Sequence, residues 1–306
     1  MSRIPAPHIT TEPRNAPWID AAVELGGGVV VGSREATAVV WTHPDDPEGL
    51  RALLDSNPTL DWVQLPWAGV EPYREVIDHR RTWSCAKGIY ADPVAEHALA
   101  LLLVGFREQH RYARRSSWGQ GQGRNLFGAR VTILGGGGIA RSLIALLAHF
   151  RCHVTVVRRS PEPVDGAARV LAADDLHEAL AGADVVVLAL PLLPDNHRVV
   201  GAAELALLAP GAWVVNVARG AHIDTDALLA ALDGGGLGGA ALDVTDPEPL
   251  PPDHPLWSRP DVIITPHTAN TPEMAKPLLT ERIATNVARY AAGQELLGLV
   301  DPDLGY

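Results

Sequence analysis

The sequence has little lysine and little cysteine. Of its 25 basic residues only Lys87 and Lys276 are lysine, which together with abundant Ala and Gly indicates biased codon usage and carries no functional signal. The only cysteines are Cys85 and Cys152, so a disulfide framework is excluded and a reducing compartment is expected.

Long hydrophobic runs are also missing. No uninterrupted apolar run reaches the length that a transmembrane helix needs. Residues 1–18 are rich in proline and lack the apolar core of a signal peptide. We therefore expect a cytoplasmic protein with no membrane partner. No internal repeat of solenoid period is present.

The charge balance excludes a general nucleic-acid-binding protein. The formal net charge is −11, and a binder of the phosphate backbone needs an excess of basic residues. Hydrophobic residues make up 47% and charged residues 20%, as is typical of a globular protein. The 306 residues are enough for two domains of ordinary size.

The stretch around residues 131–160 predicts a β-α-β unit. Residues 131–134 form a short apolar run, and the four consecutive glycines 135–138 follow as a tight turn. Residues 139–150 repeat apolar side chains at helical spacing, and residues 154–157 predict a second strand. Glycines at the strand-to-helix turn of such a unit are typical of a dinucleotide-binding site.

The backbone of the glycine turn explains physically why it would bind a dinucleotide. Gly135 permits the sharp turn, and Gly137 lets a pyrophosphate approach the main chain. The amides of Gly138 and Ile139 open the helix and face negative charge, which the helix dipole favours. Ala140 takes the third fingerprint position, where glycine or alanine is accepted.

The end of the second strand favours NADP(H) over NAD(H). NAD-binding units usually carry an acidic residue there, about 20 residues past the fingerprint, for the ribose hydroxyls. Here Arg158, Arg159 and Ser160 occupy the place, and no carboxylate follows until Glu162. Two guanidinium groups and a hydroxyl suit a 2′-phosphate. The alternative is a pair of solvated arginines at a strand end.

Strands and helices alternate along most of the chain. Near-continuous apolar strands alternating with helices indicate an α/β fold with parallel sheets that are covered on both faces. Residues 93–115 predict one long helix. The other strands expected are 29–31, 38–41, 62–64, 184–188, 213–217, 240–244 and 262–265. The other helices expected are 18–25, 48–55, 174–181, 201–208, 225–232 and 272–292.

Three ionisable residues lie just past the carboxyl ends of predicted strands, where parallel sheets bind ligands. They are Arg219, Glu248 and His267, and Asp243 lies on the strand that precedes Glu248. Together they could clamp a carboxylate, tune an imidazole and move a proton. Taken singly, Arg219 could belong to an ion pair, Glu248 could be a charge in a loop, and His267 could be a histidine with satisfied hydrogen bonds.

No metal site is expected. His149 and His153 are four residues apart, but the pair straddles the predicted helix end and has no acidic partner between its members. The scattered histidines His177, His197 and His222 are expected at the surface.

The chain resembles the D-isomer-specific 2-hydroxyacid dehydrogenase family, and within it the glyoxylate/hydroxypyruvate reductases. The resemblance spans nearly the whole chain and is weakest over residues 1–30. It departs from the family pattern at Ala140, at Arg158 in place of the usual Asp, and at Thr245-Asp246. The stretches that carry it are 64–71, 93–103, 134–140, 216–220, 238–257 and 262–267.

The resemblance implies two Rossmann-like domains with parallel sheets, the coenzyme domain being inserted into the substrate domain. Residues 1–92 and 284–306 would form the substrate-binding domain, and residues 93–283 the NAD(P)-binding domain. It also implies a homodimer through the coenzyme domain.

The resemblance further implies roles for the strand-end residues. Arg219 would bind the substrate carboxylate and keto oxygen, and His267 would protonate that oxygen. Glu248 would raise the pKa of His267, because a neighbouring anion favours imidazolium. Asp243 would meet the nicotinamide carboxamide. Further cofactor contacts are expected from Leu190, Pro191, Val217 and Ala218.

The opposite side of the expected substrate site would come from the stretch 64–71. There the amides of Ala68 and Gly69 would hold the substrate carboxylate across the cleft between the domains. Trp67 and Trp118 would wall the pocket, Trp118 from a partner subunit.

The predicted function is reduction of a small 2-keto acid, of the glyoxylate or hydroxypyruvate kind, to the D-2-hydroxy acid by hydride transfer from NADPH. One alternative is an NAD-dependent member acting on another 2-hydroxy acid. A second is a nucleotide-sensing, non-enzymatic protein like the co-repressors of this fold. A phosphoglycerate dehydrogenase with a regulatory extension is not expected, because the sequence ends at Tyr306. A formate dehydrogenase is not expected either, because its substrate needs no Glu–His pair.

Overall fold

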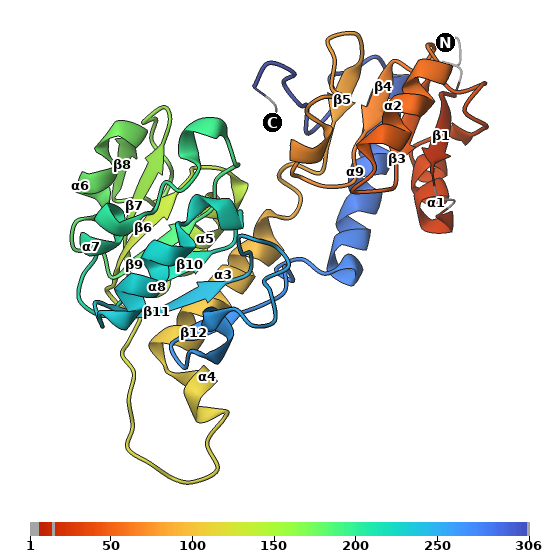
Figure 1. Cartoon of the computed structure of the whole chain (residues 1–306). Coiled ribbons are helices and arrows are strands. Elements are labelled where there is room, and N and C mark those ends of the chain that lie inside the picture. The colour runs from red at the N-terminus through yellow and green to blue at the C-terminus, as the bar shows by residue number, and fades with distance from the viewer. Residues whose placement is uncertain (1–5, 14–15, 305–306) are drawn as a thin grey trace. The chain divides into compact units, whose positions relative to one another are not determined.

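The fold is described from a computed structural model, which describes residues 6–13 and 16–304. The expectation that residues 1–18 hold no signal segment falls partly outside these residues. The chain divides into two compact units (Figure 1). Unit 1 comprises residues 1–90 and 271–306, and unit 2 comprises residues 91–270. Unit 2 is thus inserted into unit 1, as the resemblance implied.

One of the two expected domain boundaries lies close to the observed division, and the other does not. The first, after residue 92, lies beside the observed one after Tyr90. The second boundary was expected after residue 283, but the observed one follows Asn270. The physical reason is that the last helix, α9 (Pro272–Ala291), belongs to unit 1 from its first residue. Its N-cap is Thr271, whose side chain accepts from the amide of Met274, and the helix packs against α1 (Pro17–Leu25).

Unit 1 is built on a five-stranded sheet with the order β2-β1-β3-β4-β5, in which every neighbouring pair is parallel. Its strands are β1 (His8–Glu12), β2 (Val29–Val30), β3 (Ala38–Trp41), β4 (Trp62–Gln64) and β5 (Thr82–Ser84). Besides α1 and α9, unit 1 contains α2 (Pro47–Ser56). Strands β1 and β5 were not predicted, because His-Ile-Thr-Thr-Glu and Thr-Trp-Ser carry too few apolar residues to be distinguished from a loop.

A buried polar network ties α9 to the sheet of unit 1. Asn286 is fully buried and donates to Gln64 Oε1 at 2.9 Å and to the carbonyl of Leu297 at 3.0 Å. The Gln64 amide donates in turn to the carbonyl of Leu65, and its oxygen also accepts from Ser84. Every polar atom of the Gln64 side chain is therefore engaged, as burial requires.

Unit 2 holds a seven-stranded, all-parallel sheet with the order β12-β11-β10-β9-β6-β7-β8. The strands are β6 (Arg130–Leu134), β7 (His153–Arg158), β8 (Arg169–Ala172), β9 (Val185–Leu188), β10 (Ala212–Asn216), β11 (Leu237–Leu242) and β12 (Val262–Ile264). The helices are α3 (Ala91–Phe106), α4 (Gln109–Tyr112), α5 (Gly138–Ala148), α6 (Leu176–Leu180), α7 (Ala202–Ala206) and α8 (Thr225–Asp233). The α/β class with two parallel sheets is confirmed; β8 was not predicted.

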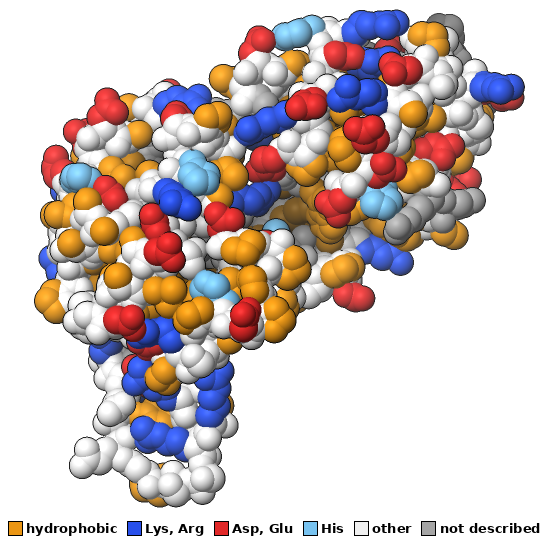
Figure 2. All heavy atoms as spheres, viewed as in Figure 1, with side chains coloured by type: hydrophobic (Ala, Val, Ile, Leu, Met, Phe, Trp, Pro, Cys, Tyr) orange, Lys and Arg blue, Asp and Glu red, His pale blue; other side chains and the backbone are white. Residues whose placement is uncertain are grey.

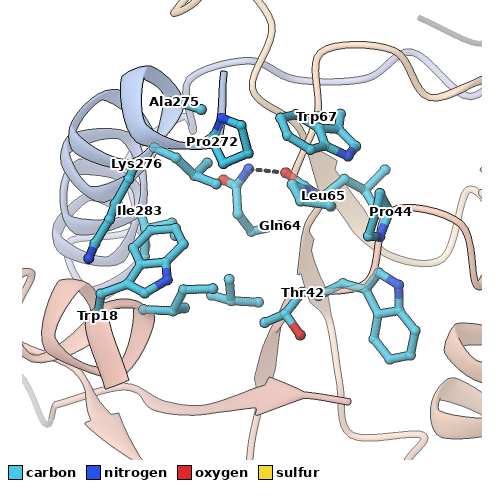
Figure 3. Close-up of a pocket in the computed structure, with 15 residues that line it drawn as sticks. Trp18, Thr42, Pro44, Gln64, Leu65, Trp67, Pro272, Ala275, Lys276 and Ile283 are labelled. Atoms are coloured by element: carbon cyan, nitrogen blue, oxygen red, sulfur yellow. Dashed lines mark hydrogen bonds between the residues drawn. The ribbon is translucent and has the colours of Figure 1, made fainter. Parts of the chain in front are cut away.

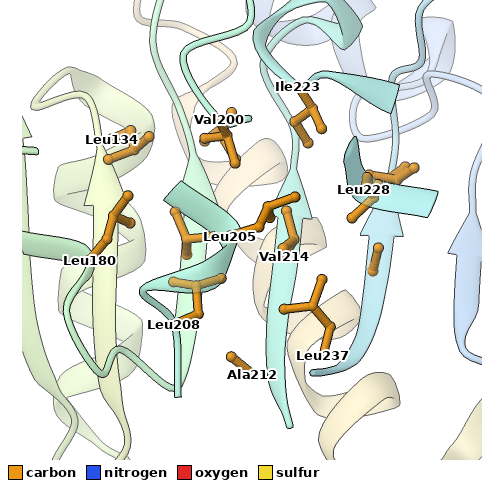
Figure 4. Close-up of a cluster of buried hydrophobic side chains, with 14 of the residues drawn as sticks. Leu134, Leu180, Val200, Leu205, Leu208, Ala212, Val214, Ile223, Leu228 and Leu237 are labelled. Atoms are coloured by element: carbon orange, nitrogen blue, oxygen red, sulfur yellow. The ribbon is translucent and has the colours of Figure 1, made fainter. Parts of the chain in front are cut away.

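Both faces of this sheet are covered. Helices α6, α7 and α8 bury a cluster of aliphatic side chains against one face, including Leu180, Leu205 and Leu228 (Figure 4). On the other side α3 and α5 pack together, and α3 contacts β10 and β11. Two-sided burial explains why β9 and β10 read as continuous apolar runs instead of alternating with polar residues.

The long helix expected over residues 93–115 is wrong in its second half. Helix α3 ends at Phe106, because Glu108 adopts a left-handed conformation with φ 55°, and the short α4 follows. The apolar pattern gave no sign of this break. The segment between α4 and β6 then projects from unit 2 (Figure 1).

Figure 2 shows acidic and basic side chains interspersed over much of the viewed face, while basic side chains predominate on the projection at its lower end. Among the helices that the structure describes, none combines the length and the hydropathy needed to cross a bilayer.

Candidate active site in unit 2

The glycine turn lies at the carboxyl end of β6, where the strand order reverses between β6 and β9. Gly135 has φ 111°, and a Cβ there would lie 2.2 Å from the carbonyl oxygen of Ala189 at the end of β9. No other residue type satisfies both constraints. The turn therefore lies at the topological switch point, the place where such sheets bind ligands.

The first turn of α5 presents open backbone donors. Among the described residues, none accepts a hydrogen bond from the amides of Gly138, Ile139 or Ala140. A Cβ added at Gly137 would meet nothing within 4 Å, so the space in front of these amides is open. Ala140 is fully buried, which shows why alanine serves at this helix–sheet contact. These residues fit the pyrophosphate of a dinucleotide.

Arg158 ends β7 beside the glycine turn. A Cβ at Gly136 would lie 3.0 Å from Arg158 Cδ, so the arginine stem crosses close to the turn. The guanidinium lies 3.4 Å from Glu162 Oε2, and the Glu162 side chain is 73% exposed. Arg159 and Ser160 follow at the surface. All three expected residues are thus grouped at the end of β7.

His222 corrects one expectation: it is fully buried and not at the surface. Its Nδ1 lies 3.1 Å from the carbonyl of Arg219 and its Nε2 lies 3.3 Å from the carbonyl of Pro191. The ring therefore joins the loop after β9, with Leu190 and Pro191, to the loop after β10.

The side chain of Asn216, which is fully buried, supports the loop after β10. Its side chain accepts from the amide of Ala218 at 3.0 Å and donates to the carbonyl of Arg219 at 2.8 Å. Val217 and Ala218 are buried beside it. The backbone that carries Arg219 is consequently fixed at both its carbonyl and the preceding amide.

Asp243 is the centre of a hydrogen-bond network and is only 2% exposed. It accepts from Thr265 Oγ1 at 2.6 Å and from the amides of Thr268 and Ala269 at 2.9 and 3.0 Å. His97 Nε2 on α3 lies 3.3 Å from the same carboxylate. Burial is the largest single influence and would raise the pKa of Asp243, but the donors together outweigh it, so the pKa is lowered.

This network positions His267. The main chain of His267 has φ 52°, an unusual conformation for a residue with a side chain. Its amide donates to the carbonyl of Asp243 at 2.8 Å, while the carboxylate of Asp243 holds the residues on either side of His267. The turn that carries the imidazole is thus fixed to the end of β11.

His267 and Glu248 form a close pair. His267 Nδ1 lies 2.7 Å from Glu248 Oε1, with the two side chains 54% and 41% exposed. The hydrogen bond between them is the main reason that the pKa of His267 is raised and the pKa of Glu248 is lowered. The pair therefore favours an imidazolium whose Nε2 is left to donate a proton.

Arg219, Glu248 and His267 follow β10, β11 and β12, which are neighbours in the sheet. Arg219 is close enough to influence the pKa of both other residues. A cation that binds anions and a histidine that carries a proton therefore share one edge of the sheet. The arrangement can polarise a carbonyl and protonate its oxygen.

The remaining expected site residues lie elsewhere. Trp67, Ala68 and Gly69 belong to unit 1, in the loop after β4. Among the described residues none accepts from the amides of Ala68 or Gly69, so both donors are open to a ligand. Trp118 lies in the projecting segment of unit 2 and is fully exposed.

Sequence reasoning missed the residues that support this site, namely His97, Thr265, Asn216 and His222. The signal for His97 was a histidine on a helix that is mostly apolar. For metals, the described residues contain no cluster of His, Cys, Asp and Glu that could hold an ion.

Replacing Glu248 with Gln should lower the pKa of His267, because the carboxylate that stabilises the imidazolium is gone while the shape is kept. Titration of the imidazole C2 proton by NMR measures this pKa. Glu204→Gln is the matched control, since Glu204 pairs with another histidine, His177, at 2.6 Å. An unchanged His267 titration in Glu248→Gln would show that the contact does not set the charge of the ring.

Comparison with known proteins shows which family this chain is similar to. The sequence profile described as "D-isomer specific 2-hydroxyacid dehydrogenase, NAD binding domain" matches residues 97–269. An uncharacterized protein from the proB 3′ region of Corynebacterium melassecola is 38% identical over 94% of this chain and 95% of its own. Glyoxylate/hydroxypyruvate reductase A of Serratia proteamaculans is 36% identical over 71% of this chain and 69% of its own.

Among solved structures, a D-isomer specific 2-hydroxyacid dehydrogenase from Xanthobacter autotrophicus, in complex with NADPH and MES, is 26% identical. It matches with a TM-score of 0.86 over 99% of this chain and all of its own. The chain therefore belongs to the D-isomer specific 2-hydroxyacid dehydrogenase family, whose members are NAD(P)-dependent oxidoreductases.

Proposed function

We propose that this enzyme reduces a small 2-keto acid, of the glyoxylate or hydroxypyruvate kind, to the D-2-hydroxy acid with NADPH. The observation that carries the proposal is the 2.7 Å contact between His267 and Glu248 on the edge of the sheet that also presents Arg219. The name of the Serratia relative supports the substrate class.

The proposed mechanism assigns one task to each residue. Arg219 binds the carboxylate and keto oxygen and stabilises the negative charge that develops on that oxygen. His267 donates the proton from Nε2, while Glu248 keeps the ring protonated through Nδ1. A bound reduced nicotinamide supplies the hydride. Asp243 holds the turn of His267 and is also proposed to meet the nicotinamide carboxamide.

The proposed cofactor contacts follow the switch point. The amides of the first turn of α5 bind the pyrophosphate, and Leu190, Pro191, Val217 and Ala218 border the cofactor. Arg158, Arg159 and Ser160 bind the 2′-phosphate, since guanidinium and hydroxyl donors match phosphate oxygens. The NADPH in the Xanthobacter structure supports this preference.

Three further parts of the proposal concern the substrate carboxylate, the oligomeric state and the cellular location. The open amides of Ala68 and Gly69 would bind the substrate carboxylate, with Trp67 beside it. The homodimer, with Trp118 contributed by the partner subunit, and the cytoplasmic location stay predictions.

Replacing His267 with Ala should lower kcat for NADPH-dependent glyoxylate reduction about 100-fold or more, because the proton donor is lost. NADPH affinity, followed by the fluorescence of the nucleotide, should stay within about threefold of wild type, since His267 is assigned to the substrate. His177→Ala removes an exposed histidine as the control. Full activity in His267→Ala would refute the assigned role.

Replacing both Arg158 and Arg159 with Ala should raise the Kd for NADPH about tenfold to 100-fold, because charge-assisted hydrogen bonds to the 2′-phosphate are lost. The Kd for NADH should change little. Arg169→Ala, at the start of the neighbouring strand β8, is the control. Equal loss of affinity for both nucleotides would contradict a 2′-phosphate site.

A further inference from the structure

The loop after β4 is held by the segment 85–90, which follows β5 in the chain. The hydroxyl of Tyr90 donates to the carbonyl of Pro66 at 3.2 Å. The amide of Ala86 donates to the carbonyl of Trp67 at 3.0 Å. Two successive carbonyls of the loop therefore accept hydrogen bonds from the same segment.

The neighbouring carbonyls on either side are engaged as well. The Gln64 side chain donates to the carbonyl of Leu65 at 2.9 Å, as the dashed line in Figure 3 shows. The thiol of Cys85, which is a weak donor, lies 3.7 Å from the carbonyl oxygen of Ala68. Four successive carbonyls, those of residues 65–68, thus accept hydrogen bonds within unit 1.

The direction of these carbonyls determines the direction of the amides. In a planar trans peptide unit the C=O and the N–H point to opposite sides. Because the segment 85–90 holds the carbonyls of residues 66–68, the amides of Trp67, Ala68 and Gly69 are directed away from it. In the part of the chain that the structure describes, no atom accepts a hydrogen bond from these three amides. Successive amides of a turn can form a concave anion-binding site.

Tyr90 is suited to hold the loop. Its side chain is buried, and its ring centre lies 6.1 Å from that of Trp67. Burial is the main reason that the pKa of Tyr90 is raised. The hydroxyl therefore keeps its proton near neutral pH and remains a donor to the carbonyl of Pro66.

The segment 85–90 is itself fixed to other parts of unit 1. Arg282 on α9 donates from Nη1 to the carbonyls of Cys85 and Lys87, at 2.9 and 3.2 Å. The amide of Cys85 donates to the carbonyl of Gly298 at 2.8 Å. Loss of one side-chain donor should therefore release the loop while the segment stays in place.

We propose that Tyr90 is a positioning residue for the substrate carboxylate. Its hydroxyl holds the loop in the conformation in which the amides of Trp67, Ala68 and Gly69 face the bound acid, and the thiol of Cys85 assists. The inference rests on the proposed function, because it takes this loop to bind the carboxylate. It adds the Trp67 amide to the donors and gives a buried tyrosine an effect on substrate affinity that acts through the loop.

The test removes the hydroxyl alone. Tyr90→Phe should raise KM for glyoxylate about threefold to tenfold, the loss expected for one hydrogen bond, with kcat and the Kd for NADPH within about twofold. Tyr290→Phe is the matched control, because its hydroxyl donates to Asp61, just before β4 and at the other end of that strand. The control should change neither KM nor kcat. Cys85→Ala should raise KM about twofold, since a thiol is a weak donor.

The outcomes separate positioning from a structural role. If Tyr90→Phe lowers only the midpoint of thermal unfolding and leaves KM equal to that of Tyr290→Phe, the proposal is overturned, while reduction of glyoxylate still supports the proposed function. The alkaline limb of the pH profile should stay in place in Tyr90→Phe, and a limb that moves would show that the hydroxyl acts on His267 instead. If Tyr90→Phe does not fold, a wild-type KM in Cys85→Ala overturns the proposal.

A binding measurement covers the case in which no keto acid is reduced. Oxamate carries a carboxylate beside an amide carbonyl that is not reduced. In calorimetric titration of the NADPH-bound protein, oxamate should bind at least about threefold more weakly to Tyr90→Phe than to wild type or Tyr290→Phe. That result supports the positioning role even though the proposed function fails. Equal affinity in wild type and Tyr90→Phe, or no binding to either, overturns it.

Discussion

The carboxylate of Asp243 is the group on which the site in unit 2 depends. It is almost fully buried, yet it stays charged because a hydroxyl, two amides and His97 surround it. A buried charge with several donors is stable only in one arrangement of those donors. The turn of residues 265–269 is therefore held at the end of β11, and His267 is presented toward Glu248. The left-handed backbone of His267 is held by the hydrogen bonds that its own amide and the two following ones make with Asp243.

Each unit places its candidate binding groups in the same way. In unit 2 the glycine turn and the Arg219 loop lie at the carboxyl ends of neighbouring parallel strands, close to the reversal of strand order. In unit 1 the loop with the open amides lies at the carboxyl end of β4. The donors differ: unit 2 offers charged groups and helix amides, whereas unit 1 offers the backbone amides of a loop.

The sequence predicted the parts of this structure that depend on local pattern. Apolar runs located β6, β9 and β10, and the glycines located the turn at Gly135. Arg219, Glu248 and His267 could be grouped because carboxyl ends of parallel strands share one edge. The rest depends on contacts between distant residues. His97 and His222 are defined by partners on other elements, and β1, β5 and β8 carry too little apolar signal. The end of α3 at Phe106 follows from the backbone of Glu108, which no periodicity reports.

The pH dependence of keto acid reduction tests the central claim most directly. The imidazolium form of His267 is the proposed acid, so kcat/KM should be constant at low pH and fall as pH rises through the raised pKa of His267. In Glu248→Gln this alkaline fall should move to lower pH, because the carboxylate no longer favours the charged ring. An alkaline limb that stays at the same pH in the variant would contradict the account, since the proton would then come from another group.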